Sequence, residues 1–291
     1  MKRDWTFQSW LETAREKNIS LGEVVLQKEI EETGATRENI FEELSLRLGV
    51  MKKSLKRGLS REDISPGGML KDEGQRLQEY FSRETSLTGA GAIKAAIYAI
   101  AIGRENAGMG RIVALPTGGA AGVVPGVLLA LGEKEELGEE ELQRGLLIAA
   151  GAGMVVGEKM EMSGAAGGCQ AECGVASGMA AAGGMALLGG EDEQAFEAFA
   201  LACKNLLGLT CDPVGGLVEV PCVKRNGFAA VQALLAVDLV RGGLQSVIPP
   251  DEIVDAMAET AGLLPGSLKE TAQAGLARTK TGLDLMANRD D

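Results

Sequence analysis

The sequence predicts an all-α fold, in which a buried helical core rich in Gly and Ala lies inside an outer helical layer. Apolar segments of helical length alternate with Gly-rich segments, and the strict apolar–polar alternation of a half-buried strand is hard to find anywhere. Aromatic residues make up only 3% of the chain, whereas 41 of its 291 residues are Gly. Aliphatic and small side chains must therefore fill the core, which favours close contact between helices.

The first part of the chain, residues 1–84, has the charged composition and apolar spacing of helices that cover a larger core. Ser20 and Glu23 have the spacing of a capping box, which marks the beginning of a helix. Thr36 is a second expected N-cap. The apolar residues of the helix after it are Phe41, Leu44, Leu46 and Leu48. The segment Ser65-Pro-Gly-Gly68 is expected to break the helical pattern.

From residue 85 to residue 291 the composition shifts toward Gly, Ala and Met, as expected for a core followed by C-terminal helices. Helices are predicted there over residues 93–104, 142–160, 174–188, 195–207 and 226–241. A final amphipathic helix after Pro249 would present Ile253, Met257 and Leu263, and a fraying acidic tail would follow it. We expect this part and the N-terminal layer to form one domain.

One apolar stretch has the length of a membrane span, but its composition argues against insertion. Residues 112–131 carry no charge over 20 positions. Pro116, Pro125 and several Gly within the stretch predict a loop followed by a buried helix instead. The first 17 residues are charged and lack the apolar segment of a signal peptide. The prediction is therefore a cytoplasmic protein without a membrane partner.

The net charge and the absence of histidine exclude several functions. A formal net charge of −12 repels phosphate, which argues against a nucleic-acid partner. Because the chain has no His, it lacks the commonest general base, the commonest zinc ligand and the usual partner of a nucleophilic Ser. A general base must therefore be Asp, Glu, Lys, Tyr or Cys, or belong to another chain.

The five cysteines are at positions 169, 173, 203, 211 and 222, and in a reducing compartment they favour metal binding or catalysis over disulfides. Cys169, Cys211 and Cys222 lie in segments rich in Gly and Pro, and thiolates are soft ligands that suit iron–sulfur clusters. Their gaps of 41 and 10 residues match no short metal motif, so spacing alone favours buried structural cysteines. Cys173 lies one helical turn after Cys169 and could face the same site, whereas Cys203 lies in an apolar helix and is assigned to the core.

Three Gly-rich segments are candidates for binding a small anion, because backbone amides at a helix N-terminus bind carboxylate or phosphate. They are Ser86-Leu-Thr-Gly89, Pro116-Thr-Gly-Gly-Ala-Ala-Gly122 and Ser163-Gly-Ala-Ala-Gly167, each expected to precede an apolar helix. None fits the phosphate-loop or dinucleotide pattern. The alternative is that their Gly residues only permit tight helix packing. The candidate substrate-binding residues are Ser86, Thr88, Gly89, Thr117, Gly118, Gly119, Ser163, Gly164, Ala165 and Gly167.

Four segments of the chain resemble a known family. They cover residues 116–126, 163–172, 208–214 and 218–226, and begin Pro-Thr-Gly-Gly, Ser-Gly-Ala-Ala, Gly-Leu-Thr-Cys and Val-Glu-Val-Pro. All four are similar to segments of the α chain of iron–sulfur-dependent L-serine dehydratases, and the likeness extends from about residue 10 to about residue 275. The departures are small: Thr88 and Ala90 stand where Ser and Pro are more common, a Gly-Gly-Ala stands where Ala-Gly-Ser is frequent after Thr117, and Cys173 stands where Val is common.

The resemblance implies an all-helical catalytic domain in which Cys169, Cys211 and Cys222 ligate a [4Fe–4S] cluster, with the fourth iron open to substrate. It implies an L-serine ammonia-lyase of amino-acid catabolism and gluconeogenesis, which eliminates water from L-serine to give pyruvate and ammonia without pyridoxal phosphate. The open iron would polarise the hydroxyl as a Lewis acid, and loop amides would hold the carboxylate. It also suggests that a separate β chain supplies the base within a hetero-oligomer. In this chain the candidates are Lys224 and Glu172, since both flank proposed ligand cysteines.

Three alternatives remain open at this point. A related iron–sulfur cysteine desulfidase would remove sulfide from cysteine at a similar cluster. A pyridoxal-phosphate dehydratase would catalyse the same reaction, but it needs a Schiff-base Lys beside a phosphate loop. The lysines Lys94, Lys159, Lys204 and Lys224 lack that setting. A non-catalytic cluster-binding module would hold the cluster without turnover.

Overall fold

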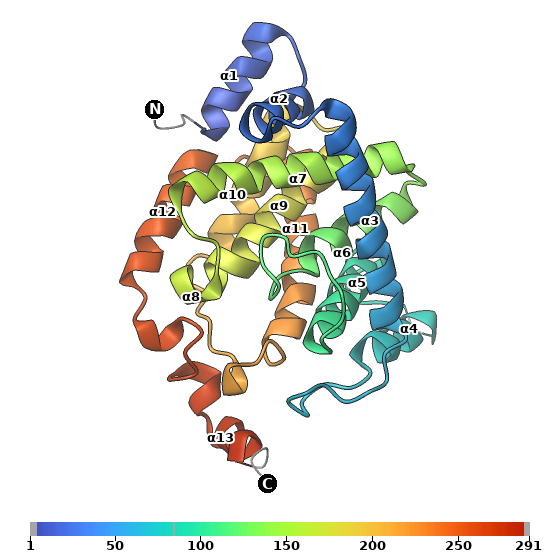
Figure 1. The fold of residues 1–291 in the computed structure, drawn as a ribbon, viewed down its shortest axis with the longest axis vertical. Helices are drawn as coiled ribbons and strands as arrows, with labels where there is room; N and C mark the ends of the chain where they lie inside the picture. Colours follow the sequence, from blue (N-terminus) through green and yellow to red (C-terminus); the bar gives the residue numbers. More distant parts are fainter. Residues whose placement is uncertain (1–4, 84, 288–291) are drawn as a thin grey trace.

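The secondary structure of the chain is helical. The computed structural model describes residues 5–83 and 85–287, and no strand forms within these ranges. Extended backbone pairs at an isolated parallel bridge between Cys211 and Lys269. The predicted all-α fold is therefore confirmed, and Figure 1 shows how the helices are arranged.

Four helices form in residues 5–83 of the N-terminal layer. They are α1 (Phe7–Lys17), α2 (Leu21–Thr33), α3 (Arg37–Leu59) and α4 (Glu73–Arg83). As predicted, the side chains of Ser20 and Thr36 cap α2 and α3, since each accepts a hydrogen bond from the third backbone amide of its helix. The prediction that Leu46 lies on the apolar face of α3 is wrong, because that side chain is 61% exposed. Two residues beyond the buried Leu44, it lies on the opposite side of the helix.

The core is built around one helix that is buried along most of its length. The core helices are α5 (Ala90–Ala107), α6 (Val123–Lys134), α7 (Glu139–Lys159), α9 (Val175–Leu187), α10 (Asp192–Asn205) and α11 (Cys222–Arg241). The central helix is α9, which α6, α7, α10 and α11 surround (Figure 1). A Cβ atom on Gly183 of α9 would lie 2.6 Å from the carbonyl oxygen of Gly145 on α7, so only Gly permits this approach. The Gly/Ala-rich core was thus correctly predicted.

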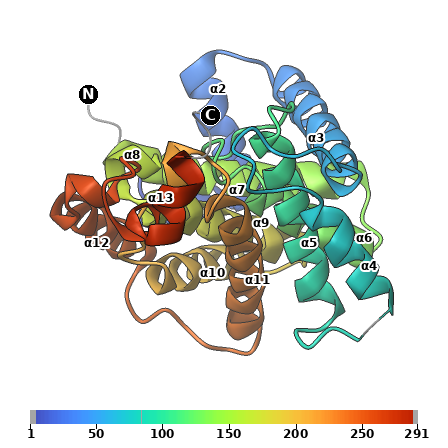
Figure 2. The same ribbon diagram turned by 90° about the horizontal axis from the view of Figure 1, so that it is seen from below.

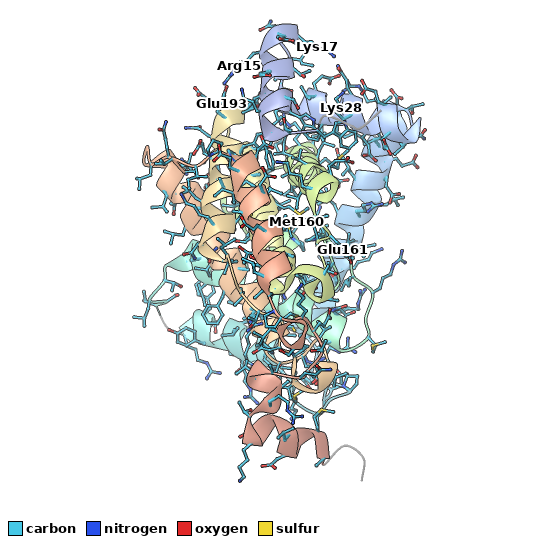
Figure 3. The ribbon with its side chains drawn as sticks, turned by 90° about the vertical axis from the view of Figure 1, so that its left-hand side faces the viewer. Arg15, Lys17, Lys28, Met160, Glu161 and Glu193 are labelled. Atoms are coloured by element: carbon cyan, nitrogen blue, oxygen red, sulfur yellow. The ribbon has the colours of Figure 1, made fainter. Side chains whose placement is uncertain are left out.

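The N-terminal layer and the core share one apolar interior. The ring of Phe7 on α1 contacts Phe196 and Phe199 of α10, with ring centroids 4.6 and 4.7 Å apart. At the surface, Arg15 of α1 forms an ion pair with Glu193 of α10 at 2.6 Å, and Figure 3 labels both residues. Buried side chains of α1, α2 and α3 belong to the same continuous hydrophobic cluster as those of the core helices and of α12 (Pro250–Leu263). The outer helices therefore complete the core rather than merely covering it.

Helices α5 and α11 pack against each other in opposite directions. Near the end of α5, Gly103 lies against Val223 in the first turn of α11. One turn further along α11, Gly227 lies against Ile100 and the carbonyl oxygen of Ala96. The start of α5 is therefore close to the end of α11, whereas the first residues of α11 are close to the end of α5. This arrangement decides which of the Gly-rich segments can reach the cysteines.

Short helices connect the core helices and lead to the C-terminus. They are α8 (Gly164–Gly167), the π-helix η1 (Gln170–Gly174), and the 3-10 helices η2 (Val214–Gly216), η3 (Gly266–Leu268) and η4 (Gly275–Arg278). The last helix, α13 (Lys280–Ala287), packs on η2, and Figure 2 views this end of the molecule. Residues 280–287 are thus helical where a fraying tail was expected, and residues 288–291 lie outside the described residues. Leu263, expected on the apolar face of α12, is 77% exposed.

The uncharged stretch over residues 112–131 folds as predicted, into a loop followed by the buried helix α6. Among the described residues, no helix has both the length and the apolar character that crossing a membrane requires.

Candidate active site

Cys169 is placed by a tight turn between two short helices. Ser163 caps α8 by accepting a hydrogen bond from the amide of Ala166 at 3.1 Å. Gly168 then adopts a positive φ of 75°, which turns the chain into η1 immediately after Cys169. Gln170 holds the segment at Gly208 and Leu209 through two hydrogen bonds of 2.9 Å. Its backbone amide donates to the Leu209 carbonyl, and its side-chain oxygen accepts from the Gly208 backbone amide. This ties η1 to the loop that carries the next cysteine.

The other two proposed ligands come from different parts of the chain. The amide of Cys211 donates to the Leu268 carbonyl at 2.9 Å, so the C-terminal segment holds this cysteine. Cys222 is the first residue of α11. The three residues are between 2% and 6% exposed, so all of their thiols are shielded from water.

The three thiols lie near enough to influence one another electrostatically. Burial raises the pKa of Cys222 to about 12, and the charge of Cys169 adds to the rise. Burial and the charge of Cys169 raise the pKa of Cys211 in the same way. The pKa of Cys169 itself is lowered, because Cys173 donates a hydrogen bond to it and the Arg225 guanidinium lies close by. Cys169 is therefore the thiol that ionises first.

By its chemistry, a set of three thiols fits an iron–sulfur cluster, whose irons take thiolate ligands. Within residues 5–83 and 85–287, no three His, Cys, Asp or Glu side chains converge closely enough to hold one ion. A cluster instead takes one thiolate on each iron, which requires thiols that are spread around a shared volume. A Cβ atom on Gly164 would lie 2.7 Å from the Cys211 sulfur, so only Gly allows the thiol to pack this closely against the backbone here. Arg225 brings a positive charge to Cys169, where thiolates would concentrate negative charge.

Glu172 is a buried carboxyl group beside the thiols. It is 7% exposed, and the Thr117 hydroxyl donates a hydrogen bond of 2.5 Å to its Oε1 atom. Burial raises the pKa of Glu172 above its ordinary value, and the charge of Glu270 adds to the rise, while the Thr117 hydrogen bond and Arg225 oppose it. A raised pKa favours the protonated form of the carboxyl group, in which it can donate a proton.

The loop that carries Thr117 is held in place by two asparagines. Asn226 of α11 donates to the Gly119 carbonyl at 2.7 Å and accepts from the Gly122 amide at 2.9 Å. Asn106 of α5 donates to the Gly118 carbonyl at 3.0 Å. The structure thus brings the Thr117–Gly119 loop to Glu172, whereas the sequence named this segment only as one of three candidates for binding a small anion.

The segment from Ser163 to Gly167 is only partly directed at the thiols. Gly164 lies against Cys211. A Cβ atom on Gly167 would instead meet Ala171 and Ala261 of α12, so Gly167 permits close packing with α12. Ala165 is exposed. The Ser163 hydroxyl donates to Glu161 at 2.8 Å in addition to its capping role, and Figure 3 labels Glu161, which follows the end of α7. The segment forms a one-turn helix rather than the loop that was expected.

The structure does not bring Ser86, Thr88 and Gly89 to the thiols. Thr88 and Gly89 border a separate cavity of about 500 Å³ next to the last turns of α11. Gly89 precedes Gly103, which packs near Cys222, by fourteen residues of α5. At 1.5 Å per helical residue, Thr88 and Gly89 therefore lie about 20 Å from the Cys222 end of the α5–α11 pair. Their role in substrate binding stays a prediction.

The second predicted acid–base residue, Lys224, is half exposed and turns toward the N-terminal layer. Its ammonium group forms an ion pair with Glu73 of α4 at 3.5 Å. Arg225, the next residue, is the basic side chain that reaches the thiols, and it also donates to the Thr210 carbonyl and to Asp212 at 2.9 Å. The sequence pattern did not single out Arg225, although it lies in residues 218–226, one of the segments that carry the family resemblance. It also missed Glu270, which no motif contains.

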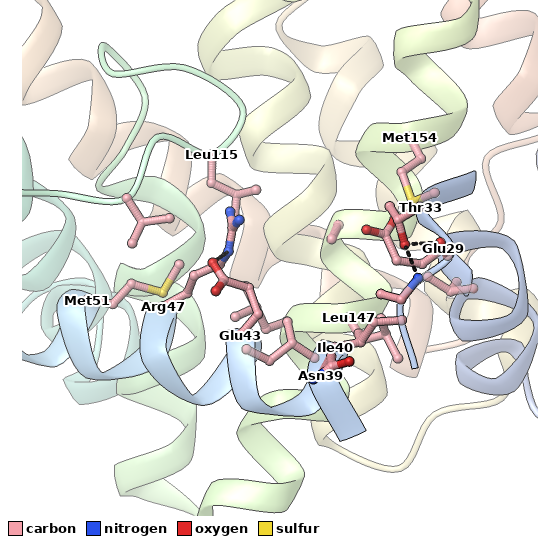
Figure 4. A pocket seen from close by; sticks show the side chains of 16 residues that line it. Glu29, Thr33, Asn39, Ile40, Glu43, Arg47, Met51, Leu115, Leu147 and Met154 are labelled. Carbon is pink, nitrogen blue, oxygen red and sulfur yellow. Dashed lines mark hydrogen bonds and ion pairs between the residues drawn. The ribbon is translucent and has the colours of Figure 1, made fainter. Parts of the chain in front are cut away.

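A second cavity lies away from these residues. It has a volume of about 300 Å³ and lies between α2, α3 and α7 (Figure 4). Its walls are mostly apolar, including Ile40, Met51 and Leu147, and no cysteine lines it. Glu43 and Arg47 lie at this cavity and pair with each other at 2.8 Å. The cavity therefore lacks the chemistry of the thiol site.

Fold and site together define an all-helical protein in which a Gly-rich loop, a buried carboxyl group and three buried thiols meet. This chain belongs to the serine dehydratase alpha chain family, whose model matches residues 16–277. It is 45% identical over 275 residues to a probable L-serine dehydratase alpha chain of Bacillus subtilis, covering 94% of this chain and 91% of that one. It is 38% identical over 277 residues to the L-serine dehydratase alpha chain of Peptoniphilus asaccharolyticus, covering 95% of each. It is also 37% identical over 276 residues to L-serine dehydratase 2 of Escherichia coli, covering 87% of this chain but 60% of that one.

Proposed function

We propose that the chain is the α chain of an L-serine dehydratase that converts L-serine to pyruvate and ammonia. The observation that carries the proposal is the meeting of Glu172, the Thr117–Gly119 loop and three thiols in one buried site, in a chain of this family. L-Serine loses its α-proton and its hydroxyl group, which leaves as water. The resulting aminoacrylate tautomerises to an imine, and one water hydrolyses the imine to pyruvate and ammonia. The names of the relatives favour this reaction over a cysteine desulfidase or a non-catalytic module.

Cys169, Cys211 and Cys222 would hold a [4Fe–4S] cluster in this site. When bound, the cluster would supply a Lewis acid for the substrate hydroxyl. Neighbouring residues of the chain prepare the proposed ligand cysteines for this role. Arg225 favours the thiolate form of Cys169, and Gly164 allows the Cys211 thiol to pack against the backbone.

Glu172 is assigned the transfer of a proton to the departing hydroxyl group. Thr117 holds the carboxyl group at a fixed position, and burial favours its protonated form. The amides of Gly118 and Gly119 are assigned to the substrate carboxylate, because Asn106 and Asn226 already engage the loop carbonyls. The two asparagines thus fix the loop through its carbonyl groups, which leaves the Gly118 and Gly119 amides to face the substrate.

A β chain is proposed as the partner that accepts the α-proton. The chain contains no His, and it covers about 60% of the longer relatives from Escherichia coli and Streptomyces coelicolor. The relatives from Bacillus subtilis and Peptoniphilus asaccharolyticus are named as alpha chains, and such a name implies a second chain in a hetero-oligomer. The proposed location is the cytoplasm, where thiols stay reduced.

The proposal is tested with the α and β chains prepared together without oxygen. Pyruvate formed from L-serine and sulfide formed from L-cysteine are measured side by side. We expect pyruvate to dominate; faster release of sulfide, or no turnover of either substrate, would refute the assignment.

Iron analysis of two variants tests the ligands. Cys211→Ser should lose iron, whereas Cys203→Ser, a change at a core cysteine that is 0% exposed, should keep it. Full iron retention in Cys211→Ser would show that Cys211 is not a ligand.

A further inference from the structure

Glu270 comes from the C-terminal segment and is locked beside Cys211. Its amide donates to the Cys211 carbonyl at 2.8 Å, and the Cys211 amide donates to the Leu268 carbonyl at 2.9 Å. These two bonds hold residues 268–270 against Cys211. The backbone of Glu270 has a φ of 62°, a left-handed conformation that is unfavourable for a residue with a side chain. Such strain persists where the surrounding structure holds a side chain in a particular direction.

That direction is toward the thiol site. The Oε2 atom of Glu270 lies 3.3 Å from the position of a Cβ atom on Gly164, which is also the residue beneath the Cys211 sulfur. The carboxylate of Glu270 raises the pKa of Glu172, Cys211 and Cys222 through its negative charge. Glu270 therefore faces the same volume as Glu172 and the proposed ligands Cys211 and Cys222.

The carboxylate of Glu270 has no partner of its own. It forms no hydrogen bond and no ion pair with any residue in the described part of the chain, although it is half-buried. The other acidic groups nearby are engaged, since Glu172 accepts from Thr117 and Asp212 accepts from Arg225 and from the Leu276 amide. An unpaired, partly buried negative charge is unfavourable until a cation is placed beside it.

The basic side chain of the site is not available for that role. Arg225 donates to the Thr210 carbonyl, to Asp212 and to Cys169. Lys224 pairs with Glu73 on the outer layer. The cation that satisfies Glu270 must therefore come from the substrate or from another chain, and L-serine carries one on its α-carbon.

On the proposed function above, we infer that Glu270 binds the α-ammonium group of L-serine and makes the site specific for amino acids over hydroxy acids. The substrate then spans the site, with its carboxylate on the Gly118 and Gly119 amides and its ammonium group at Glu270. Glu270 is a substrate-binding residue in this assignment, and the proton transfers remain with Glu172 and the β chain.

The test compares two ligands on the cluster-loaded α–β complex. L-Serine and 3-hydroxypropionate differ only in the ammonium group, and their dissociation constants are measured by calorimetry or by inhibition. Glu270→Gln keeps the shape of the side chain and removes its charge. We expect binding of L-serine to weaken about 10- to 100-fold, the size of one charge-assisted hydrogen bond, while 3-hydroxypropionate binds as before. Glu270→Asp, which keeps the charge, should retain part of the discrimination.

The controls separate this inference from structural damage and from the proposed function. Glu259→Gln removes an exposed carboxylate on α12 and should leave both dissociation constants unchanged. Iron content is measured in every variant. If Glu270→Gln weakens both ligands equally, or neither, the inference is wrong while serine turnover by the unaltered complex still supports the proposed function. If the unaltered complex does not bind L-serine, the proposed function fails as well.

Discussion

At the scale of single residues, the candidate site depends on how closely the Glu172 carboxyl group approaches the Gly119 backbone. A Cβ atom on Gly119 would lie 2.5 Å from Oε1 of Glu172, well inside van der Waals contact. The same oxygen accepts the hydrogen bond from Thr117, so it has little freedom to retreat. The adjacent Gly118 differs, because a Cβ atom there would meet nothing closer than Asn106 at 3.8 Å.

This difference gives a matched pair of variants. Gly119→Ala should displace the Glu172 carboxyl group and lower kcat/KM about 100-fold, since small misplacements of a reacting group have effects of this size. Gly118→Ala should cause a much smaller loss. Steady-state kinetics on the α–β complex, with the melting temperature of each variant as a check on folding, measure the difference. A larger loss for Gly118→Ala would contradict the assignment of Glu172.

At the scale of elements, a buried carboxylate connects the N-terminal layer to the start of α11. Glu219 is 3% exposed and precedes Cys222 by three residues. It accepts hydrogen bonds from the Ser65 hydroxyl at 2.5 Å and from the Gly67 amide at 2.6 Å. The predicted break at residues 65–68 is therefore a loop with a specific anchor, and the anchor lies next to a proposed cluster ligand.

Replacement of this anchor should destabilise the fold. Glu219→Ala leaves the donors of the 65–69 loop without an acceptor and should lower the free energy of unfolding by about 3 kcal/mol. Urea denaturation followed by circular dichroism measures this as a lower midpoint. Glu62→Ala, an exposed carboxylate on the same segment, should change the free energy by less than about 0.5 kcal/mol. Equal effects of the two changes would show that the anchor contributes nothing specific.

At the scale of the whole molecule, the site is assembled from segments that are distant in sequence. Thr117 precedes α6, Cys169 precedes η1, Cys211 lies in the loop after α10, and Glu270 belongs to the C-terminal segment. All the proposed cluster ligands lie within this chain, but it has no His to accept a proton from a carbon atom. We therefore expect cluster binding to need only this chain, and catalysis to need both this chain and the β chain.

The isolated chain should accordingly bind the cluster but turn over poorly. Without the general base that we assign to the β chain, pyruvate formation should fall by about 10² to 10⁴, while the iron content stays the same. The measurement is reconstitution of the chain alone and of the α–β complex, followed by iron analysis and a pyruvate assay of each. Full turnover without a partner would place the base in this chain, with Glu172 and Lys224 as the residues to test.

Features that depend on neighbouring residues were predictable from the sequence. The N-caps at Ser20 and Thr36, the loop before α6 and the burial of Cys203 all follow from residue types within a few positions of one another. The Gly-rich composition likewise indicated a closely packed helical core. The errors at Leu46 and Leu263 arose because an apolar residue on a helix was assigned to the buried face without regard to its angular position.

The sequence by itself thus determined the helical class, most helix positions and the resemblance from which the ligand set was inferred. Only the tertiary structure decided which Gly-rich segment meets Glu172, because the antiparallel packing of α5 and α11 separates Gly89 from the Cys222 end of the pair. It also decided that Arg225, rather than Lys224, reaches Cys169, and that Glu270 lies beside Cys211. The physical reason is that helix formation depends on local side chains, whereas contacts across 59 positions, from Cys211 to Glu270, depend on the packing of every helix between them.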